Sequence, residues 1–181
     1  EELPAPPNMT ATDLLRLPDD GYGYELYEGM LVRTMTSPGH GDLCQRLGFE
    51  LGLYARASGF PHQIVQNTLF DLTPPGAAAR LVLAPDLAIR RAGAPATWSV
   101  PQEAPLLAVE VVAGSQTLAE LARKARLYRQ AGVDEVWLVD HATRVIQITN
   151  AQGTHTLHDT QTLTSPLLPG FALAVRTLLD G

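Results

Sequence analysis

The sequence predicts an α/β domain built on a mixed β-sheet, and three observations lead to that prediction. The first is a strand–helix–strand pattern at 105–113, 118–131 and 135–140, whose strands are apolar on both faces. A right-handed crossover between parallel strands is expected there, in the centre of the sheet. The second is a set of flanking hairpin patterns, which adds antiparallel strands. The third is the length of 181 residues, which suits one domain.

Cap and turn signals define the elements of the first half. A short helix is expected over 10–17, followed by a hairpin of YELYE and MLVRTM that turns at Gly29. SPGHGD then starts a helix that runs to about Ala57, because apolar side chains repeat along one face and Gly59 ends it. HQIVQNTLFDL is expected to be extended, and TPPGAAA to form a loop.

The second half contains the central pattern and two further hinges. RLVLAPDLAIRR holds two short apolar runs joined at Pro85–Asp86, where proline cannot donate a ladder hydrogen bond. A proline-rich surface loop is expected over 91–105. A serine or threonine should cap the following helix, and Gly132 should end it. RVIQITNAQGTHTLHD predicts a hairpin, and PLLPGFALAV leads into a short terminal helix.

Composition excludes several classes of protein. Hydrophobic residues make up 45% of the chain and charged residues 18%, which suits a folded core and not a disordered chain. No apolar run reaches the ~18 residues of a membrane span, and no signal peptide is recognisable, so a cytoplasmic protein without a membrane partner is expected. The single cysteine, Cys44, excludes a disulfide framework. Residues 1–8 are expected to be a loose leader or a cloning remnant before one domain over 9–181.

The net charge of −6 argues against binding nucleic acid by bulk electrostatics. Any contact with DNA must therefore be local, assisted by metal ions, or built by a dimer. A homodimer is expected because one small acidic domain offers little surface for gripping a duplex. Among the 13 basic residues, Lys124 is the single lysine, which suggests a position that needs a compact ammonium group.

Two carboxylates interrupt apolar strand patterns. Glu110 lies within LLAVEVVA, and a buried carboxylate needs a positive partner or a metal ion. Asp86 follows Pro85 between two apolar runs. Taken singly, Glu110 is also typical of a structural ion pair and Asp86 of a turn aspartate. On neighbouring strands, however, the two carboxylates could share a Mg²⁺ ion, which would polarise a phosphoryl oxygen.

Helical spacing places Lys124 and Glu120 together on one flank of the apolar face of 118–131. Arg123 and Arg126 are expected to point to solvent. One interpretation of the flank is an ordinary i,i+4 pair of Glu120 with Lys124. The other is that Lys124 reaches the carboxylates, where it would orient an attacking water or stabilise charge on a transferring phosphate.

Six motifs follow one another along the chain, and together they span essentially residues 9–179. They are YELYEG (24–29), SPGH (37–40), PD (85–86), EVVAGSQT (110–117), ELARKARLYRQAGVDEVWLVD (120–140) and LPGF (168–171). This ordered set resembles the Uma-two family of restriction-endonuclease-like proteins. That family is a branch of the PD-(D/E)xK nuclease superfamily in which the lysine has moved to the helix after the glutamate strand.

The resemblance implies a fold, a reaction and a set of site residues. The fold is a restriction-endonuclease-like mixed β-sheet core flanked by helices, and the reaction is hydrolysis of DNA phosphodiester bonds with Mg²⁺ or Mn²⁺. Asp86 and Glu110 would be the metal ligands, and Lys124 the catalytic lysine. The resemblance adds Glu25 as a further carboxylate and His40 as a polar group near the site.

The usual superfamily motif has lysine two residues after the glutamate, and that position is Val112 here, in keeping with a lysine that has moved to the helix. The chain also departs from the family pattern close to the expected site. The family's Ser-Pro after the glutamate strand is Ala113–Gly114 here, and its helix aspartate is Glu120, which stays a candidate site residue.

These departures and the acidic charge favour an alternative function. The chain would then be a non-catalytic relative, an interaction or nucleic-acid-binding domain whose carboxylates and lysine form a structural network. A different phosphoryl-transfer enzyme or metal hydrolase on the same residues also fits. The remaining histidines have no metal-ligand spacing and are expected at the surface; they are His62, His141, His155 and His158.

Overall fold

The structure is a computed structural model that describes residues 2–34, 36–94, 99–114 and 116–180. Its elements are β1 (Glu2–Pro4), α1 (Ala11–Leu14), β2 (Gly23–Tyr27), β3 (Met30–Thr34), α2 (Pro38–Ser58), β4 (Gln63–Gln66), β5 (Phe70–Asp71), β6 (Val82–Leu83), β7 (Leu87–Arg90), β8 (Leu107–Val111), α3 (Leu118–Gln130), β9 (Glu135–Asp140), β10 (Val145–Asn150), β11 (Gly153–His158), β12 (Thr162–Leu163), β13 (Leu173–Ala174) and α4 (Val175–Asp180). Met35, Ser115 and part of the expected loop over 91–105 lie outside the described residues.

A six-stranded mixed sheet forms the centre, in the order β11-β10-β9-β8-β7-β4. β8 and β9 run parallel, with Leu107 opposite Glu135, and α3 makes the crossover between them. The other neighbouring pairs of this sheet are antiparallel. β8 and β9 are buried along their whole length, as their continuous apolar patterns predict. The predicted α/β fold with a mixed sheet is therefore confirmed.

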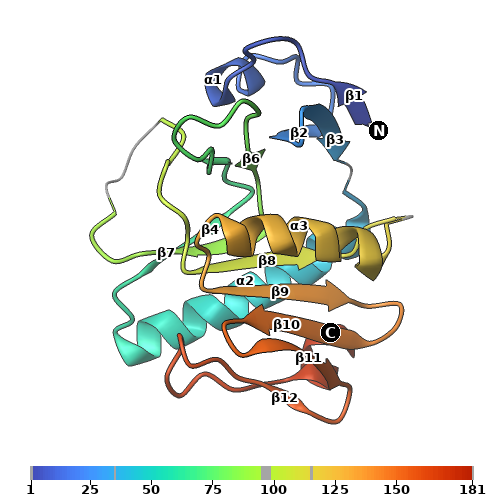
Figure 1. Cartoon of the computed structure of the whole chain (residues 1–181). Helices are drawn as coiled ribbons and strands as arrows, with labels where there is room; N and C mark the ends of the chain where they lie inside the picture. The colour runs from blue at the N-terminus through green and yellow to red at the C-terminus, as the bar shows by residue number, and fades with distance from the viewer. Residues whose placement is uncertain (1, 35, 95–98, 115, 181) are drawn as a thin grey trace.

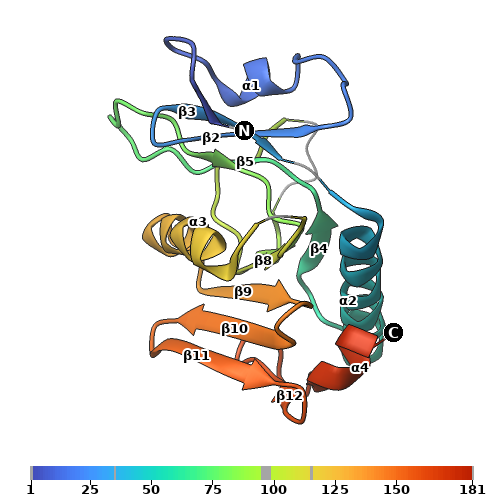
Figure 2. The same ribbon diagram turned by 90° about the vertical axis from the view of Figure 1, so that its right-hand side faces the viewer.

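Helices cover both faces of this sheet (Figure 1, Figure 2). On one face, leucines of α2 pack with Val109 and Val111 of β8 in a core that also includes residues of α4. On the other face, α3 packs with Ala108 of β8 and with Val136 and Leu138 of β9. Alternation along β8 thus directs the odd-numbered side chains toward α2 and the even-numbered ones toward α3.

A second sheet, in the order β1-β3-β2-β6-β5, is stacked at the α3 side of the molecule (Figure 2). The sequence predicts one sheet with flanking hairpins, but the structure places the β2–β3 hairpin in this separate antiparallel sheet. Its two-residue turn has positive φ at Glu28 (52°) and Gly29 (78°), as a type I′ turn requires. β6 ends just before Pro85, which cannot continue a hydrogen-bond ladder, so the chain leaves one sheet there and enters the other at β7.

The N-terminal segment contains a strand that the sequence pattern does not predict. Glu2–Pro4 pairs with β3 as strand β1. The backbone N–H of Ala5 donates to the carbonyl of Gly29 at 2.9 Å, which extends this pairing. Strand pairing satisfies backbone groups even where the side chains are exposed, so composition alone does not reveal it.

Two caps set the position of α2. Ser37 begins the helix by accepting the N–H of His40, and Gly59, in the left-handed conformation with φ 65°, ends it. The N-cap places His40 in the first turn, on the buried side.

Within the described part of the chain, α2 and the other helices lack the combination of length and apolar character needed to cross a membrane.

Packing of α2 on the sheet can be tested with two leucines of the same helix. Leu47 is 1% exposed and Leu53 is 46% exposed. Leu47→Ala leaves a cavity in the core, so it should lower the free energy of unfolding by about 3 kcal/mol. Leu53→Ala should change it by less than about 0.5 kcal/mol. Urea unfolding measures both, and equal losses would contradict the assignment of the buried face.

Candidate active site

Glu25, Glu110 and Lys124 meet in the space between the two sheets and α3. The ammonium Nζ of Lys124 lies 2.8 Å from Oε1 of Glu25 and 2.7 Å from Oε1 of Glu110. All three side chains are buried, with at most 9% exposed. Lys124 is therefore the positive partner that a buried Glu110 needs. It contacts the two carboxylates and is not paired with Glu120 on its own helix.

Tyr128 is a further member of this group and was not among the candidate site residues from the sequence. It lies one turn after Lys124 on α3, so both side chains extend toward β8. The Tyr128 hydroxyl donates a hydrogen bond of 2.8 Å to Oε1 of Glu110. Oε1 of Glu110 is thus held by two donors from one helix face.

Asp86 is held beside Glu110 by the strand register and by two contacts. Leu87 pairs with Val109 across β7 and β8, so extending the register by one residue places Asp86 opposite Glu110. Oδ2 of Asp86 accepts the backbone N–H of Val111 at 2.7 Å and lies 3.0 Å from Nε2 of His40. The Asp86 side chain is 13% exposed, so this is not a solvated turn aspartate.

Glu25 connects the second sheet to the hinge that carries Asp86. The backbone N–H of Ala84 donates to Oε1 of Glu25 at 2.6 Å, the same oxygen that contacts Lys124. Ala84 stands two residues before Asp86, between β6 and β7. The position of Glu25 on β2 therefore affects both Lys124 and the backbone next to Asp86.

Burial and crowding of negative charge dominate the electrostatics. Burial raises the pKa of Glu110 to about 8; Asp86 and Glu25 add to the rise, and Lys124 opposes it. For Lys124 burial alone would lower the pKa, but the charges of Glu110 and Glu25 outweigh it and the pKa lies above its ordinary value. When all three carboxylates are ionised they face one ammonium group, which leaves two negative charges for another cation to balance.

A thiol and an imidazole lie on the α2 side of Asp86. Sγ of Cys44 is 3.8 Å from Nδ1 and 3.9 Å from Nε2 of His40, one helical turn away. One ligand atom each of His40, Cys44 and Asp86 lie within 4.8 Å of one another, so the three could hold a metal ion. Burial raises the pKa of the Cys44 thiol to about 12, and the charges of Asp86 and Glu110 add to this.

Glu120, a candidate from the sequence, lies apart from this group. Its side chain is exposed, and its Oε2 accepts the backbone N–H of Thr117 at 2.7 Å in a capping box at the start of α3. Glu120 is therefore placed in the helix cap, because Thr-x-x-Glu at a helix start satisfies backbone donors that have no intrahelical partner. Arg123 is 42% exposed, on the solvent side as expected, and forms ion pairs with Glu28 and, at 3.6 Å, with Glu2.

Sequence reasoning missed three features of the site. Tyr128 and Cys44 each stand four residues after a candidate, Lys124 and His40, so i,i+4 spacing was the available signal. The third feature is the pair of backbone N–H groups of Ala84 and Val111, which hold Glu25 and Asp86. Every residue except proline has such a group, so the sequence does not show which ones make these contacts. Contacts of that kind depend on how the two sheets are placed.

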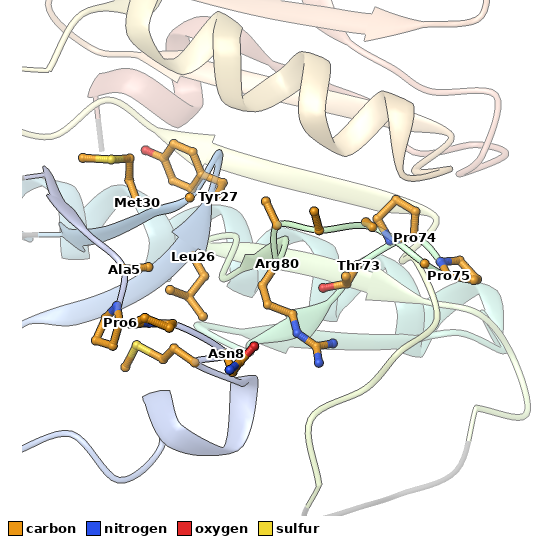
Figure 3. A pocket seen from close by; sticks show the side chains of 17 residues that line it. Ala5, Pro6, Asn8, Leu26, Tyr27, Met30, Thr73, Pro74, Pro75 and Arg80 are labelled. Atoms are coloured by element: carbon orange, nitrogen blue, oxygen red, sulfur yellow. The ribbon is translucent and has the colours of Figure 1, made fainter.

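Two pockets flank these residues. One of about 640 Å³ has His40 in its wall, together with residues at the ends of β8 and β9 and the start of α3. The other, of about 470 Å³, lies against the second sheet and is lined by small and apolar residues with Asn8, Thr73 and Arg80 (Figure 3). Of the site residues, His40 lines the first pocket, whereas the described residues that line the second pocket include none of them.

Comparisons with known proteins identify a family and a similar fold. The model of the Uma2 family, described as "Putative restriction endonuclease", matches residues 11–176. Among solved structures, the chain is similar to a "putative nuclease belonging to DUF820" from Anabaena variabilis ATCC 29413, with a TM-score of 0.77 and 14% identity over 95% of this chain and 98% of that chain. At that identity the likeness shows the fold alone. A search among curated proteins found no match.

Titration of Glu110 predicts a pH dependence of stability in the metal-free protein. The folded-state pKa is raised from the ordinary 4.5 to about 8, so the folded protein keeps a proton that the unfolded chain releases. The contribution of Glu110 is full below pH 4.5 and is lost as the pH rises through about 8.

Urea unfolding in the presence of a chelator, at several pH values across this window, measures the effect. In Glu110→Gln, the free energy of unfolding should fall less between pH 4.5 and about 8 than it does in wild type. Glu50 lies on α2, outside the group, so Glu50→Gln should show the wild-type pH dependence. A wild-type stability that rises from pH 4.5 to 8, with the same slope in Glu110→Gln, would contradict the prediction.

Proposed function

Because the chain belongs to the Uma2 family of "Putative restriction endonuclease" proteins, we propose that it hydrolyses DNA phosphodiester bonds with Mg²⁺ or Mn²⁺. The observation that carries this proposal is the buried group in which Asp86 lies opposite Glu110 while Lys124 contacts Glu110 and Glu25. Paired carboxylates next to a lysine are the groups that metal-dependent phosphoryl transfer requires.

The residues present fit a divalent ion with oxygen ligands. Lys124 and Tyr128 both contact Oε1 of Glu110, and Val111 and His40 both contact Oδ2 of Asp86. These contacts leave the second oxygen of each carboxylate for an ion. When all three carboxylates are ionised, the two uncompensated negative charges would match the charge of the ion. Bound to Asp86 and Glu110, such an ion would polarise a phosphoryl oxygen and lower the pKa of a water molecule.

The side chains around the two carboxylates have separate roles in this proposal. Lys124 keeps its proton because its pKa is raised, so it serves as a hydrogen-bond donor to charge that develops on the phosphate and not as a base. Glu25 holds the Lys124 ammonium in place, and Tyr128 fixes the orientation of Glu110. His40 does the same for Asp86 from the other side.

DNA is the proposed substrate, and a homodimer is part of the proposal. The net charge of −6 repels a polyphosphate, so a single copy has little electrostatic affinity for a duplex. Two copies that act together would double the contact surface and present two sites to the two strands.

A second candidate function is that of a non-catalytic DNA-binding or interaction domain. The observation that favours it is the internal pairing of the group. Lys124 already contacts two carboxylates, and Asp86 already accepts a backbone N–H. In that case the charges would serve only to join α3, β2 and β8.

Asp86 provides the direct test of catalysis. Asp86→Asn keeps the size of the side chain and removes its charge, so Mg²⁺- or Mn²⁺-dependent cleavage of supercoiled plasmid should fall by about 100-fold or more. Asp42→Asn, at an exposed position of α2, is the matched control and should cleave as wild type does. Circular dichroism checks that both variants fold. Cleavage by Asp86→Asn at the wild-type rate would disprove the proposal.

Lys124 separates a metal site from a purely structural network. Lys124→Met leaves Glu25 and Glu110 buried without their ammonium, so the free energy of unfolding should fall by roughly 3–5 kcal/mol. Arg126→Met, at an exposed position of the same helix, should cost less than about 0.5 kcal/mol.

Unfolding in Mn²⁺ then decides between the two functions. For a metal site, the ion should raise the melting temperature of wild type and recover part of the stability that Lys124→Met loses. A structural network predicts no effect of Mn²⁺ on either protein.

A further inference from the structure

His40, Cys44 and Asp86 form a second group of potential ligands, on the α2 side of Asp86. The proposed hydrolysis uses Asp86 as a metal ligand and His40 to orient it, but has no use for the Cys44 thiol. Cys44 lies 3.8 and 3.9 Å from the two ring nitrogens of His40, and Nε2 of that ring lies 3.0 Å from Oδ2 of Asp86. An N, an S and an O ligand atom thus converge within 4.8 Å of one another.

These separations suit a tetrahedral metal ion. Zinc bonds of about 2.0–2.1 Å to nitrogen or oxygen and 2.3 Å to sulfur imply ligand atoms about 3.3–3.6 Å apart at tetrahedral angles. With Nε2 as the His40 ligand atom, the separations of 3.0 Å from Oδ2 of Asp86 and 3.9 Å from Sγ of Cys44 each differ from that range by about 0.3 Å. The Cys44 and Asp86 ligand atoms lie within 4.8 Å of each other, so they would have to move closer by rotation of their side chains.

We propose that His40, Cys44 and Asp86 bind a divalent cation that accepts sulfur ligands, namely Zn²⁺. A thiolate and an imidazole select Zn²⁺ over Mg²⁺, which prefers oxygen ligands. Three protein ligands leave a fourth coordination position open. The pocket of about 640 Å³ that has His40 in its wall provides a path for entry. On binding, the Cys44 thiol loses its proton to solvent and coordinates as the thiolate.

The proposed zinc site shares Asp86 with the proposed catalytic metal site, so binding of Zn²⁺ would affect catalysis. Asp86 is also a ligand of the proposed Mg²⁺ or Mn²⁺ ion, so occupation by Zn²⁺ competes with that ion. Zn²⁺ is therefore an inhibitor of the cleavage reaction, and this consequence rests on the proposed function. Binding of Zn²⁺ itself does not.

Cobalt substitution tests the binding site without reference to activity. Cys44 is the single cysteine of the chain, so any thiolate-to-cobalt charge-transfer band must come from it. Co²⁺ added to the reduced full-length protein should produce this band together with intense tetrahedral ligand-field bands, and equimolar Zn²⁺ should abolish both. Mg²⁺ should weaken the bands only at concentrations far above that of Co²⁺, because it competes through Asp86 alone and prefers oxygen ligands to the thiolate.

Variants decide whether the three residues act together. Cys44→Ser should remove the charge-transfer band. His40→Gln and Asp86→Asn should each weaken Co²⁺ binding at least about tenfold, as expected for loss of one ligand. His155→Gln, at an exposed position of β11, is the matched control and should bind as wild type does. Absence of the band in wild type, or a band that persists unchanged in His40→Gln and Asp86→Asn, would overturn the proposal.

Inhibition is measured separately, as the ratio of Mg²⁺-dependent cleavage with and without Zn²⁺ within each variant. Wild type should lose cleavage at Zn²⁺ concentrations that Cys44→Ser tolerates, and equal sensitivity would refute inhibition through this site. If wild type does not cleave DNA in Mg²⁺ or Mn²⁺ at all, the proposed function fails. The cobalt spectra still decide the zinc site in that case.

Discussion

The contact of one ammonium group with two buried carboxylates is the interaction on which the rest of the site depends. Lys124 on α3 neutralises charge on Glu25 of β2 and on Glu110 of β8, so it joins the crossover helix to both sheets. Neither glutamate would be tolerated in its position alone, because an unpaired buried carboxylate costs several kcal/mol. The pair of contacts therefore explains why a charge can lie in the middle of the most apolar strand of the chain.

The hinge at Pro85–Asp86 is the second constraint, and it depends on the first. Proline ends one ladder before β7 begins, which lets the chain pass from the second sheet into the central sheet. Asp86 is thereby placed directly before the start of β7, where the backbone N–H of Val111 holds it next to Glu110. Glu25 accepts the N–H of Ala84 in the same hinge, so the second sheet supports the site directly.

Asp86 stands between two kinds of ligand. On one side is Glu110, which with Asp86 makes an oxygen-rich, negatively charged environment suited to Mg²⁺ or Mn²⁺. On the other side are His40 and Cys44, whose nitrogen and sulfur atoms suit Zn²⁺. Under the two proposals, the choice between the ions would be a matter of ligand chemistry at one carboxylate, and Cys44 would be the residue that adds the second option.

Periodicity, caps and turn residues are local properties, so the sequence by itself determined the helices, the parallel β8–α3–β9 unit and the hinge at Asp86. It also identified Glu110, Lys124 and Asp86, because a charged residue in an apolar pattern needs a partner. Only the tertiary structure decided which partners meet. The division into two sheets, the contact of Glu25 with Lys124, and the placement of Glu120 in a helix cap all depend on packing between segments far apart in the chain. Those contacts are made by backbone N–H groups and by particular side-chain rotamers. Neither can be read from the identity of the residue and its neighbours in the sequence.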